Sequence, residues 1–212
     1  MKNSVIKFSN GELFLEGVWH VPEGSGSFPS VVICHPHPLY GGDMDNNVVT
    51  AIFKAATIKS VAALRFNFRG VGRSGGKYDK GVGEQSDLQA ALDFISRQPR
   101  MDHTRLMVAG YSFGGNVALN VAIKDVRVQG IILVSPGFDL ENWLRFADFQ
   151  KPKFVMLGSQ DTSVPWQGYE KYFGSDRKYR IIDGADHSWS GFEDELEKQT
   201  VQFLSNNLNL EK

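Results

Sequence analysis

The sequence predicts an α/β architecture in which a mostly parallel β-sheet is covered by helices on both faces. Two observations predict it. From residue 30 onward, short apolar runs alternate with segments of helical periodicity, the order expected for parallel strands joined by helices. The apolar run at 30–34 is also continuous, which is typical of a strand buried on both faces. We therefore expect three layers, helix, sheet and helix.

Eight strands are predicted in total. The first two, at 5–8 and 13–21, are joined by the turn Ser9-Asn10-Gly11, and a loop rich in glycine and proline follows at 22–29. Asn46 suits the start of the first helix, and Pro99 follows the end of the second. The remaining strands are expected at 30–34, 61–68, 105–109, 128–134, 153–157 and 178–182, and the helices at 46–59, 84–98, 116–123, 139–149 and 189–207.

The composition is that of an ordinary globular chain. With 212 residues, of which 42% are hydrophobic and 22% charged, the chain fits a single domain, 1–212. A net charge of −1 gives no reason to expect nucleic acid or an anionic membrane surface as a partner. Cys34 is the single cysteine, so it forms no internal disulfide and fits a reducing compartment as a small core residue. With no apolar signal core or membrane-length apolar run, a cytoplasmic protein is expected.

The clearest chemical signal lies between Val108 and Asn116. This stretch has the pattern Gly-x-Ser-x-Gly around Ser112, between an apolar run and a helical pattern. Such a sharp turn from strand to helix, a nucleophile elbow, holds the serine hydroxyl exposed in a strained backbone conformation. Gly110 and Gly114 suit the turn because side chains there would crowd it. Ser112 is therefore the candidate nucleophile.

The same pattern occurs a second time, around Ser74 at 72–76. With 22 glycines a chance match is unsurprising, so the pattern alone does not identify a nucleophile. Ser74 lies well beyond the preceding predicted strand, and no helix start follows it. Ser112 instead joins a strand directly to a helix, whose first N–H groups would point at the reacting centre. We interpret Ser74 as a turn residue.

A serine nucleophile needs a general base, and the base needs an acid that orients it. For a nucleophile elbow the usual order along the chain is serine, acid, histidine. His187 is the only histidine downstream of Ser112, and it lies in the loop after the last predicted strand. We therefore predict His187 as the base.

Several aspartates are candidates for the acid. Asp161 follows the seventh strand, in the usual position, and is the preferred candidate. Asp139 follows the sixth strand, where some enzymes of this kind place their acid, and is the alternative. Asp183 and Asp186 share the loop of His187 and are poorly placed to bond its far ring nitrogen.

An acyl-transfer transition state also needs hydrogen-bond donors for its oxyanion. The backbone N–H of Phe113, directly after the nucleophile, is one candidate. The second should come from the loop 35–42, whose two prolines have no N–H. The candidates narrow to His37, Leu39 and Tyr40, with His37 favoured because it comes second after the first histidine of the loop.

His35 and His37 also raise the alternative of a metal site. The adjacent prolines restrict its geometry, and no Asp or His cluster at ligand spacing completes it. We therefore expect a reaction that requires neither a metal nor another cofactor.

At these residues the chain resembles the α/β-hydrolase superfamily over nearly its whole length. It looks most like small, lidless bacterial serine hydrolases related to the dienelactone hydrolases. The resemblance implies an eight-stranded sheet with the first pair partly antiparallel and a Ser-Asp-His triad. Dienelactone hydrolase itself uses a cysteine nucleophile, so the serine here argues against that activity. The shared motifs are His35-Pro-His-Pro38 with Gly41, Gly42 and Asn46, then Asn67-Phe-Arg-Gly-Val-Gly-Arg-Ser74, Gly110-Tyr-Ser-Phe-Gly-Gly115, Asp161 and His187.

The resemblance also bears on the loop 69–76 and on substrate access. It implies a structural role for Arg69 and Arg73, although their loop lies near the rim of the site. Between the sixth and seventh strands only 137–152 remains, enough for one short helix, so no large cap domain is expected. An uncapped serine argues against interfacial action on long-chain fats. Five aromatic residues could wall an acyl or aromatic pocket, or pack under loops: Tyr40, Phe138, Trp143, Trp166 and Trp189.

The expected function is that of a serine hydrolase of carboxylesterase type, with a small-molecule ester as its partner. Short acyl chains or small soluble esters are the expected substrates. Thioester hydrolysis, peptide hydrolysis and acyl transfer are alternatives that would use the same three residues. A non-catalytic binding protein is a further alternative, although a decayed site would be expected to have lost one of them.

Overall fold

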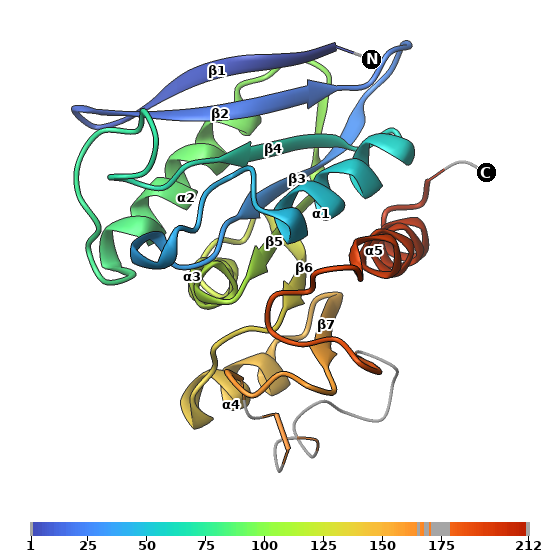
Figure 1. The fold of residues 1–212 in the computed structure, drawn as a ribbon. Helices are drawn as coiled ribbons and strands as arrows, with labels where there is room; N and C mark the ends of the chain where they lie inside the picture. The colour runs from blue at the N-terminus through green and yellow to red at the C-terminus, as the bar shows by residue number, and fades with distance from the viewer. Residues whose placement is uncertain (1, 165, 168–169, 171–178, 211–212) are drawn as a thin grey trace.

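The computed structural model describes residues 2–164, 166–167, 170 and 179–210, and its strands form one eight-stranded sheet. The strands are β1 Lys2–Asn10, β2 Leu13–Val21, β3 Phe28–Cys34, β4 Ala62–Phe66, β5 Met101–Tyr111, β6 Val128–Val134, β7 Lys153–Gly158 and β8 Tyr179–Ile182. Their spatial order is β1-β2-β4-β3-β5-β6-β7-β8 (Figure 1). β2 is antiparallel to both of its neighbours, and all pairs from β4 to β8 are parallel. The predicted mostly parallel sheet is confirmed.

Helices cover both faces of the sheet (Figure 1). Helices α1 (Asn47–Ile58) and α5 (Glu193–Asn207) lie on one face and share an apolar cluster with it. Helices α2 (Val82–Ser96), α3 (Phe113–Ala122) and α4 (Leu140–Asp148) bury their apolar side chains in a second cluster on the other face. One apolar cluster lies between the sheet and the helices on each face, so the structure has the three predicted layers.

Local sequence explains how the central layer forms. From Val31 to Cys34 every side chain is fully buried, as the continuous apolar run predicts. Burial of each such aliphatic side chain contributes about 1.5–3 kcal/mol to stability. Asn46 caps α1 as predicted, because its side chain accepts a 3.0 Å hydrogen bond from the Val48 N–H. Cys34 is a core residue, and burial raises the pKa of its thiol.

Several element boundaries differ from those predicted by a few residues, and two of the differences have a clear tertiary cause. The strand expected at 61–68 ends at Phe66, because the Phe68 N–H bonds the ring of His35 instead of a neighbouring strand. The closing helix begins at Glu193 and not at Trp189, since Trp189 has a φ of 57° and its indole is buried. The last strand begins at Tyr179; Lys178, where it was expected to start, lies outside the described residues.

The loop after β4 is held by buried polar contacts rather than by regular structure. Arg69 donates to the buried carboxylate of Asp87, with Nη2 2.9 Å from Oδ1. The Arg73 N–H donates to Glu16 at 2.6 Å. Ser74 is also buried, and its hydroxyl donates to the Asn67 carbonyl at 2.7 Å. The side chains of Arg69 and Ser74 therefore have structural roles, whereas the contact of Arg73 is made by its backbone N–H.

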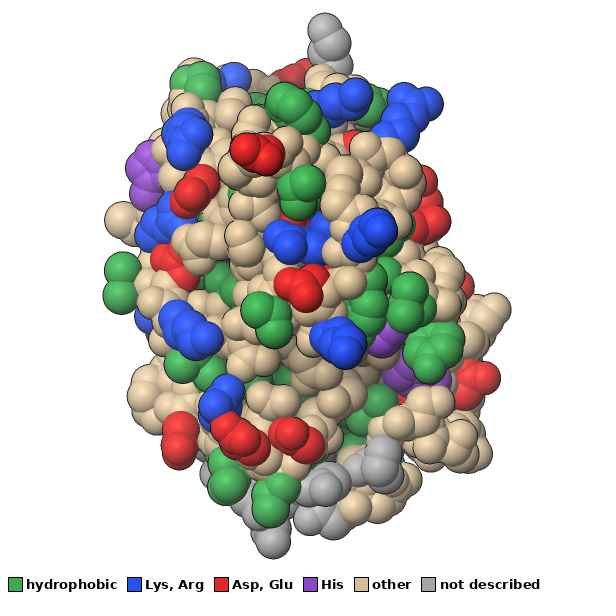
Figure 2. Space-filling model, turned by 90° about the vertical axis from the view of Figure 1, so that its left-hand side faces the viewer, with side chains coloured by type: hydrophobic (Ala, Val, Ile, Leu, Met, Phe, Trp, Pro, Cys, Tyr) green, Lys and Arg blue, Asp and Glu red, His purple; other side chains and the backbone are tan. Residues whose placement is uncertain are grey.

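The carboxyl ends of β3, β5, β6, β7 and β8 meet at one edge of the sheet, where α/β folds form their binding crevices. Between β6 and β7 the chain forms only α4, with no large cap domain. On the face in Figure 2, acidic and basic side chains are interspersed, as the net charge near zero suggests. Within the described residues, no helix is long and apolar enough to span a membrane.

Candidate active site

Ser112 occupies the sharp turn between β5 and α3. Its backbone has φ 52° and ψ −116°, a conformation that L-residues with side chains rarely adopt. Such strain persists only where the surrounding structure enforces it. Here the Ser112 N–H donates to the Val134 carbonyl at 2.9 Å, and the Gly115 N–H donates to the Ser112 carbonyl at 2.9 Å. The predicted elbow geometry is therefore present.

The two glycines of the elbow are required by close backbone contacts. A Cβ atom on Gly110 would lie 2.3 Å from the carbonyl oxygen of Gly114. A Cβ atom on Gly114 would lie 2.5 Å from the carbonyl oxygens of Cys34 and His35. The absence of side chains thus lets the first turn of α3 approach β5 and the end of β3.

Three of the predicted residues come together above the elbow. The Oγ of Ser112 lies 3.1 Å from Nε2 of His187, and Nδ1 of His187 lies 2.9 Å from Oδ2 of Asp161. An ionised carboxylate only accepts hydrogen bonds, so Nδ1 carries the ring proton. In the neutral ring Nε2 then accepts from the serine hydroxyl. This is the arrangement in which a histidine can remove the serine proton.

Asp161 is kept ionised by its surroundings. Its side chain is almost fully buried, and burial is the largest influence on its pKa, raising it. Hydrogen bonds from His187 and Ser135 outweigh burial, so the net pKa lies below the usual value. The other oxygen, Oδ1, accepts from the N–H groups of Ser163 at 2.9 Å and Val164 at 3.0 Å. A charged, fixed acceptor therefore faces His187.

Two supporting residues were not predicted from the sequence. The Tyr111 hydroxyl donates to the backbone carbonyl of His187, and the two rings lie 5.5 Å apart. Ser135, fully buried at the end of β6, supports Asp161, and its Oγ accepts from the Trp189 indole N–H at 3.0 Å. Tyr111 is the last residue of β5 and Ser135 directly follows β6. This position at the carboxyl end of a central parallel strand could have identified both as site residues.

The other aspartates are occupied elsewhere. Asp139 caps α4, accepting from the Asn142 N–H at 2.8 Å, so the structure does not bring it to His187. Asp183 accepts from the Ser159 hydroxyl at 3.1 Å. Asp186 accepts from the backbone and hydroxyl of Ser188, within its own loop.

The loop after β3 contains the three candidate amides for the oxyanion. It continues into a short 3-10 helix, η1 (Pro38–Tyr40). The Leu39 N–H donates to the His37 ring at 3.2 Å, and the Tyr40 N–H donates to the His37 carbonyl at 3.1 Å. Among the described contacts, the N–H groups of His37 and Phe113 donate to no protein acceptor. The rings of these two residues lie 5.0 Å apart.

His35 has both ring nitrogens engaged inside the protein. Nδ1 lies 2.7 Å from the Pro36 carbonyl, and Nε2 accepts from the Phe68 N–H at 3.0 Å. Burial lowers the pKa of His35 to about 4, so the ring is neutral at pH 7. Neither nitrogen is free to hold a metal, and the described residues contain no group of three or more ligands suited to one. The alternative of a metal site at His35 and His37 is not supported.

A cavity of about 850 Å³ lies over the elbow. Tyr40 lines it, as predicted, and is 87% exposed. The other four aromatic residues do not line it, and for them the alternative of packing holds. Trp143 and Trp189 are fully buried on opposite faces of the sheet, where their apolar area contributes to the two core clusters. Phe138 packs on Trp143 with ring centres 5.0 Å apart, and Trp166 donates its indole N–H to the Gly158 carbonyl.

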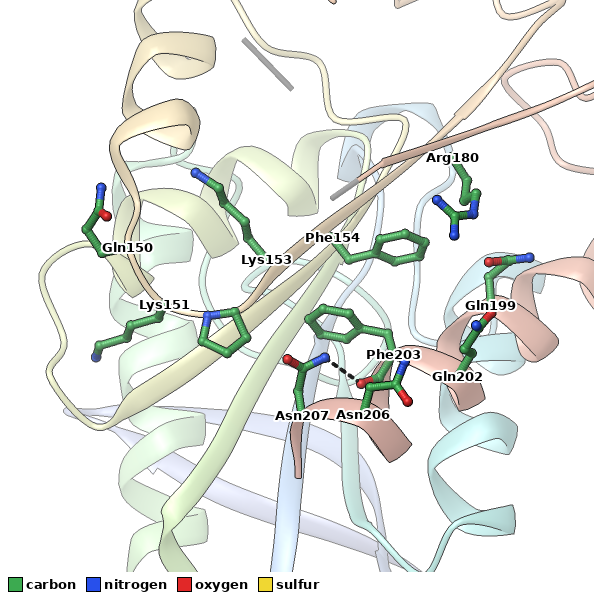
Figure 3. A pocket seen from close by; sticks show the side chains of 11 residues that line it. Gln150, Lys151, Lys153, Phe154, Arg180, Gln199, Gln202, Phe203, Asn206 and Asn207 are labelled. Atoms are coloured by element: carbon green, nitrogen blue, oxygen red, sulfur yellow. Dashed lines mark hydrogen bonds between the residues drawn. The ribbon is translucent and has the colours of Figure 1, made fainter. Parts of the chain in front are cut away.

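A second cavity, of about 540 Å³, lies between β7 and α5 (Figure 3). It is lined by amide side chains, by the stacked pair Phe154 and Phe203, and by Arg180. Figure 3 shows Lys151 at the opposite end from Arg180, and its ammonium donates to the Val126 carbonyl at 3.0 Å. None of the described lining residues is a serine, cysteine or histidine, so they provide no hydroxyl or thiol nucleophile and no histidine base.

Comparisons with known proteins agree with this fold. Residues 29–155 match the family model for the alpha/beta hydrolase fold. An uncharacterised protein of Rickettsia prowazekii is 31% identical over 210 residues, which cover 94% of this chain and 87% of that protein. An alpha-beta serine hydrolase homologue from Coxiella burnetii is 33% identical, with a TM-score of 0.84 and coverage of 95% of this chain and 97% of that one.

A serine hydrolase without a lid from Xanthomonas campestris is 26% identical, with a TM-score of 0.82 and coverage of 100% and 98%. The esterase FrsA of Escherichia fergusonii is 28% identical over 127 residues, which are 58% of this chain and 28% of that protein. Fold and site thus define an α/β protein of the serine hydrolase class. The chain belongs to the alpha/beta hydrolase fold family, and its similarity to these proteins supports hydrolase activity.

Proposed function

We propose that this protein is a serine hydrolase of carboxylic esters, with Ser112 as nucleophile, His187 as general base and Asp161 as the orienting acid. One observation carries the proposal: Ser112 Oγ is 3.1 Å from His187 Nε2, while the opposite ring nitrogen is 2.9 Å from the Asp161 carboxylate. Both distances lie within hydrogen-bond reach, as proton transfer requires.

In the first step Ser112 Oγ attacks the acyl carbon while His187 takes the serine proton. The amides of Phe113 and His37 stabilise the oxyanion that forms, since both lack a described protein acceptor. His187 then gives its proton to the alcohol oxygen, which leaves. Water, activated by the same base, releases the acid and regenerates Ser112.

Esters of small, soluble molecules fit this site best. The nucleophile opens into a cavity of about 850 Å³ with no cap domain over it, and polar side chains form much of the wall. The name of the Escherichia fergusonii protein, an esterase, supports the same bond type. The three proposed catalytic residues need no metal or cofactor for acyl transfer.

Covalent labelling tests the proposal directly. A fluorophosphonate probe should label the wild type, and Ser112→Ala should abolish both labelling and hydrolysis of p-nitrophenyl acetate, with kcat reduced on the order of a millionfold. Ser74→Ala is the matched control, because it removes the serine of the second glycine pattern and should keep labelling. Full esterase activity in Ser112→Ala would refute the proposal.

Wild-type protein that folds but neither labels nor hydrolyses the ester would favour the non-catalytic binding alternative. If Ser112 labels, kcat/KM values on matched esters, thioesters and aminoacyl amides identify the preferred bond. A higher value on thioesters or amides than on esters would overturn the ester assignment while retaining the serine mechanism.

A further inference from the structure

The charges around Ser112 are unevenly distributed. Among the described residues that line its cavity, Asp186 is the one carboxylate and no lysine or arginine occurs. The rest of the polar lining consists of His37, His187 and neutral amides and hydroxyls. Asn47, Gln160 and Ser188 are examples of these neutral residues. A charged substrate group therefore meets a negative side chain and no positive one in the described part of the wall.

Asp186 is exposed and its charge is fixed by local hydrogen bonds. Oδ1 accepts from the Ser188 N–H at 2.8 Å and from the Ser188 hydroxyl at 2.6 Å. These hydrogen bonds from Ser188 lower the pKa of the carboxyl group, which is ionised at neutral pH. No described basic side chain forms an ion pair with Asp186, so its charge faces the cavity uncompensated.

The chemistry indicates which part of a substrate meets Asp186. The base must give its proton to the leaving alcohol oxygen, so the alcohol portion lies on the His187 side of Ser112. Asp186 and Ser188 are the chain neighbours of His187, and all three residues line the cavity. The loop with His37 and Tyr40 carries the candidate oxyanion amide and lines the cavity as well.

The positive ends of the nearby helices do not offset the negative charge of Asp186. Helix α1 begins beside the same cavity, which Asn46 and Asn47 line, but the Val48 N–H is already bonded to the Asn46 side chain. The positive end of α3 acts at Ser112 and fades within the first turn of the helix. It therefore assists the oxyanion rather than a negative group on the alcohol.

We infer that the site selects esters by the charge of their alcohol portion, accepting cationic alcohols best and carboxylate-bearing alcohols worst, with Asp186 as the specificity-determining residue. This rests on the proposed ester hydrolysis by Ser112. Esters of amino or quaternary ammonium alcohols are the substrate class that fits this charge.

Three acetate esters of similar length test it: acetylcholine, the uncharged 3,3-dimethylbutyl acetate, and 4-acetoxybutanoate. At low ionic strength kcat/KM for acetylcholine should exceed that of the neutral ester by about three- to fivefold, the upper part of the range of an exposed charge pair. The carboxylate ester should fall below the neutral one by a similar factor. The ratios compared are kcat/KM of the cationic ester and of the carboxylate ester, each divided by kcat/KM of the neutral ester. Both ratios should move toward one in about 0.5 M salt, because salt screens exposed charges.

Asp186→Asn should bring both ratios close to one, since the amide oxygen can still accept from Ser188 while the charge is gone. Asp183→Asn is the matched control: it removes the same charge three residues away, outside the cavity lining, and should leave the ratios unchanged. Equal ratios in wild type and Asp186→Asn would overturn the inference but leave the esterase intact. A wild type that hydrolyses p-nitrophenyl acetate but none of the three esters would overturn the inference alone, and failure on p-nitrophenyl acetate as well would overturn both.

Discussion

His187 Nδ1 lies 2.9 Å from Oδ2 of Asp161, although the two residues are 26 positions apart in sequence. The contact forms because β7 and β8 are parallel neighbours whose carboxyl ends meet at one edge of the sheet. Each loop therefore presents its polar residue at the same place. Ser112 follows β5 at the same edge. The chain of hydrogen bonds from Ser112 through His187 to Asp161 therefore joins the loops after β5, β8 and β7.

The first prediction concerns the orienting acid. Asp161→Asn should reduce kcat on p-nitrophenyl acetate by about ten-thousandfold, because the neutral amide no longer holds His187 in the tautomer that accepts the serine proton. Stopped-flow or steady-state hydrolysis at pH 7.5 measures it. Asp139→Asn is the control, since asparagine is an equally good helix cap and activity should persist. A loss below about tenfold in Asp161→Asn would reject Asp161 as the acid.

Tyr111 should act as a positioning residue. Tyr111→Phe keeps the ring beside His187 but removes the hydroxyl that donates to the His187 carbonyl. A net hydrogen bond of this kind contributes about 0.5–1.5 kcal/mol, so kcat should fall about three- to tenfold. KM for a small ester should stay within a factor of about two, because the ring of residue 111, which lines the cavity, is retained. An increase in KM with unchanged kcat would contradict the positioning role.

The elbow should tolerate no side chain at Gly114. In Gly114→Ala the new Cβ would lie 2.5 Å from two backbone carbonyl oxygens, which cannot move without displacing β3. We expect the free energy of unfolding in urea to drop by about 3 kcal/mol or more. Gly75→Ala is the matched control, since its Cβ meets nothing closer than 3.5 Å. A Gly114→Ala variant as stable as Gly75→Ala would show that the close approach is not required.

His35 should make the protein less stable in mild acid. Its pKa is lowered by burial from 6.5 to about 4, so between these pH values the unfolded chain binds a proton that the folded protein does not. The free energy of unfolding must therefore fall as pH decreases through this window, by about 3 kcal/mol for this group when the window is fully crossed.

Urea unfolding at intervals from pH 7.5 to pH 4 measures this dependence. In His35→Gln the side-chain amide can still accept from the Phe68 N–H but does not titrate, so the slope over this window should decrease. A slope identical to that of the wild type would assign the acid sensitivity to other groups.

Much of the fold could be predicted from the sequence, because buried apolar side chains recur at a spacing that is typical of the strand or helix that carries them. Strands buried on both faces require continuous apolar runs, and the run at 30–34 lies where β3 is fully buried. The pairing of Ser112 with His187 was expected from their order and from the strands before them. Boundaries were less accurate where tertiary contacts override local pattern, as at Trp189, whose left-handed backbone excludes the helix expected there.

The sequence by itself determined the α/β layering and two residues of the candidate triad, Ser112 and His187, since periodicity and the order of residues along the chain can be read without the fold. Only the tertiary structure decided which aspartate faces His187, that Tyr111 and Ser135 support the loop and the acid, and that Trp143 and Trp189 pack in the core. These depend on which strand ends become neighbours and which way each side chain points. The physical reason is that hydrogen bonds of about 3 Å join residues far apart in sequence, and only the folded sheet brings them within that distance.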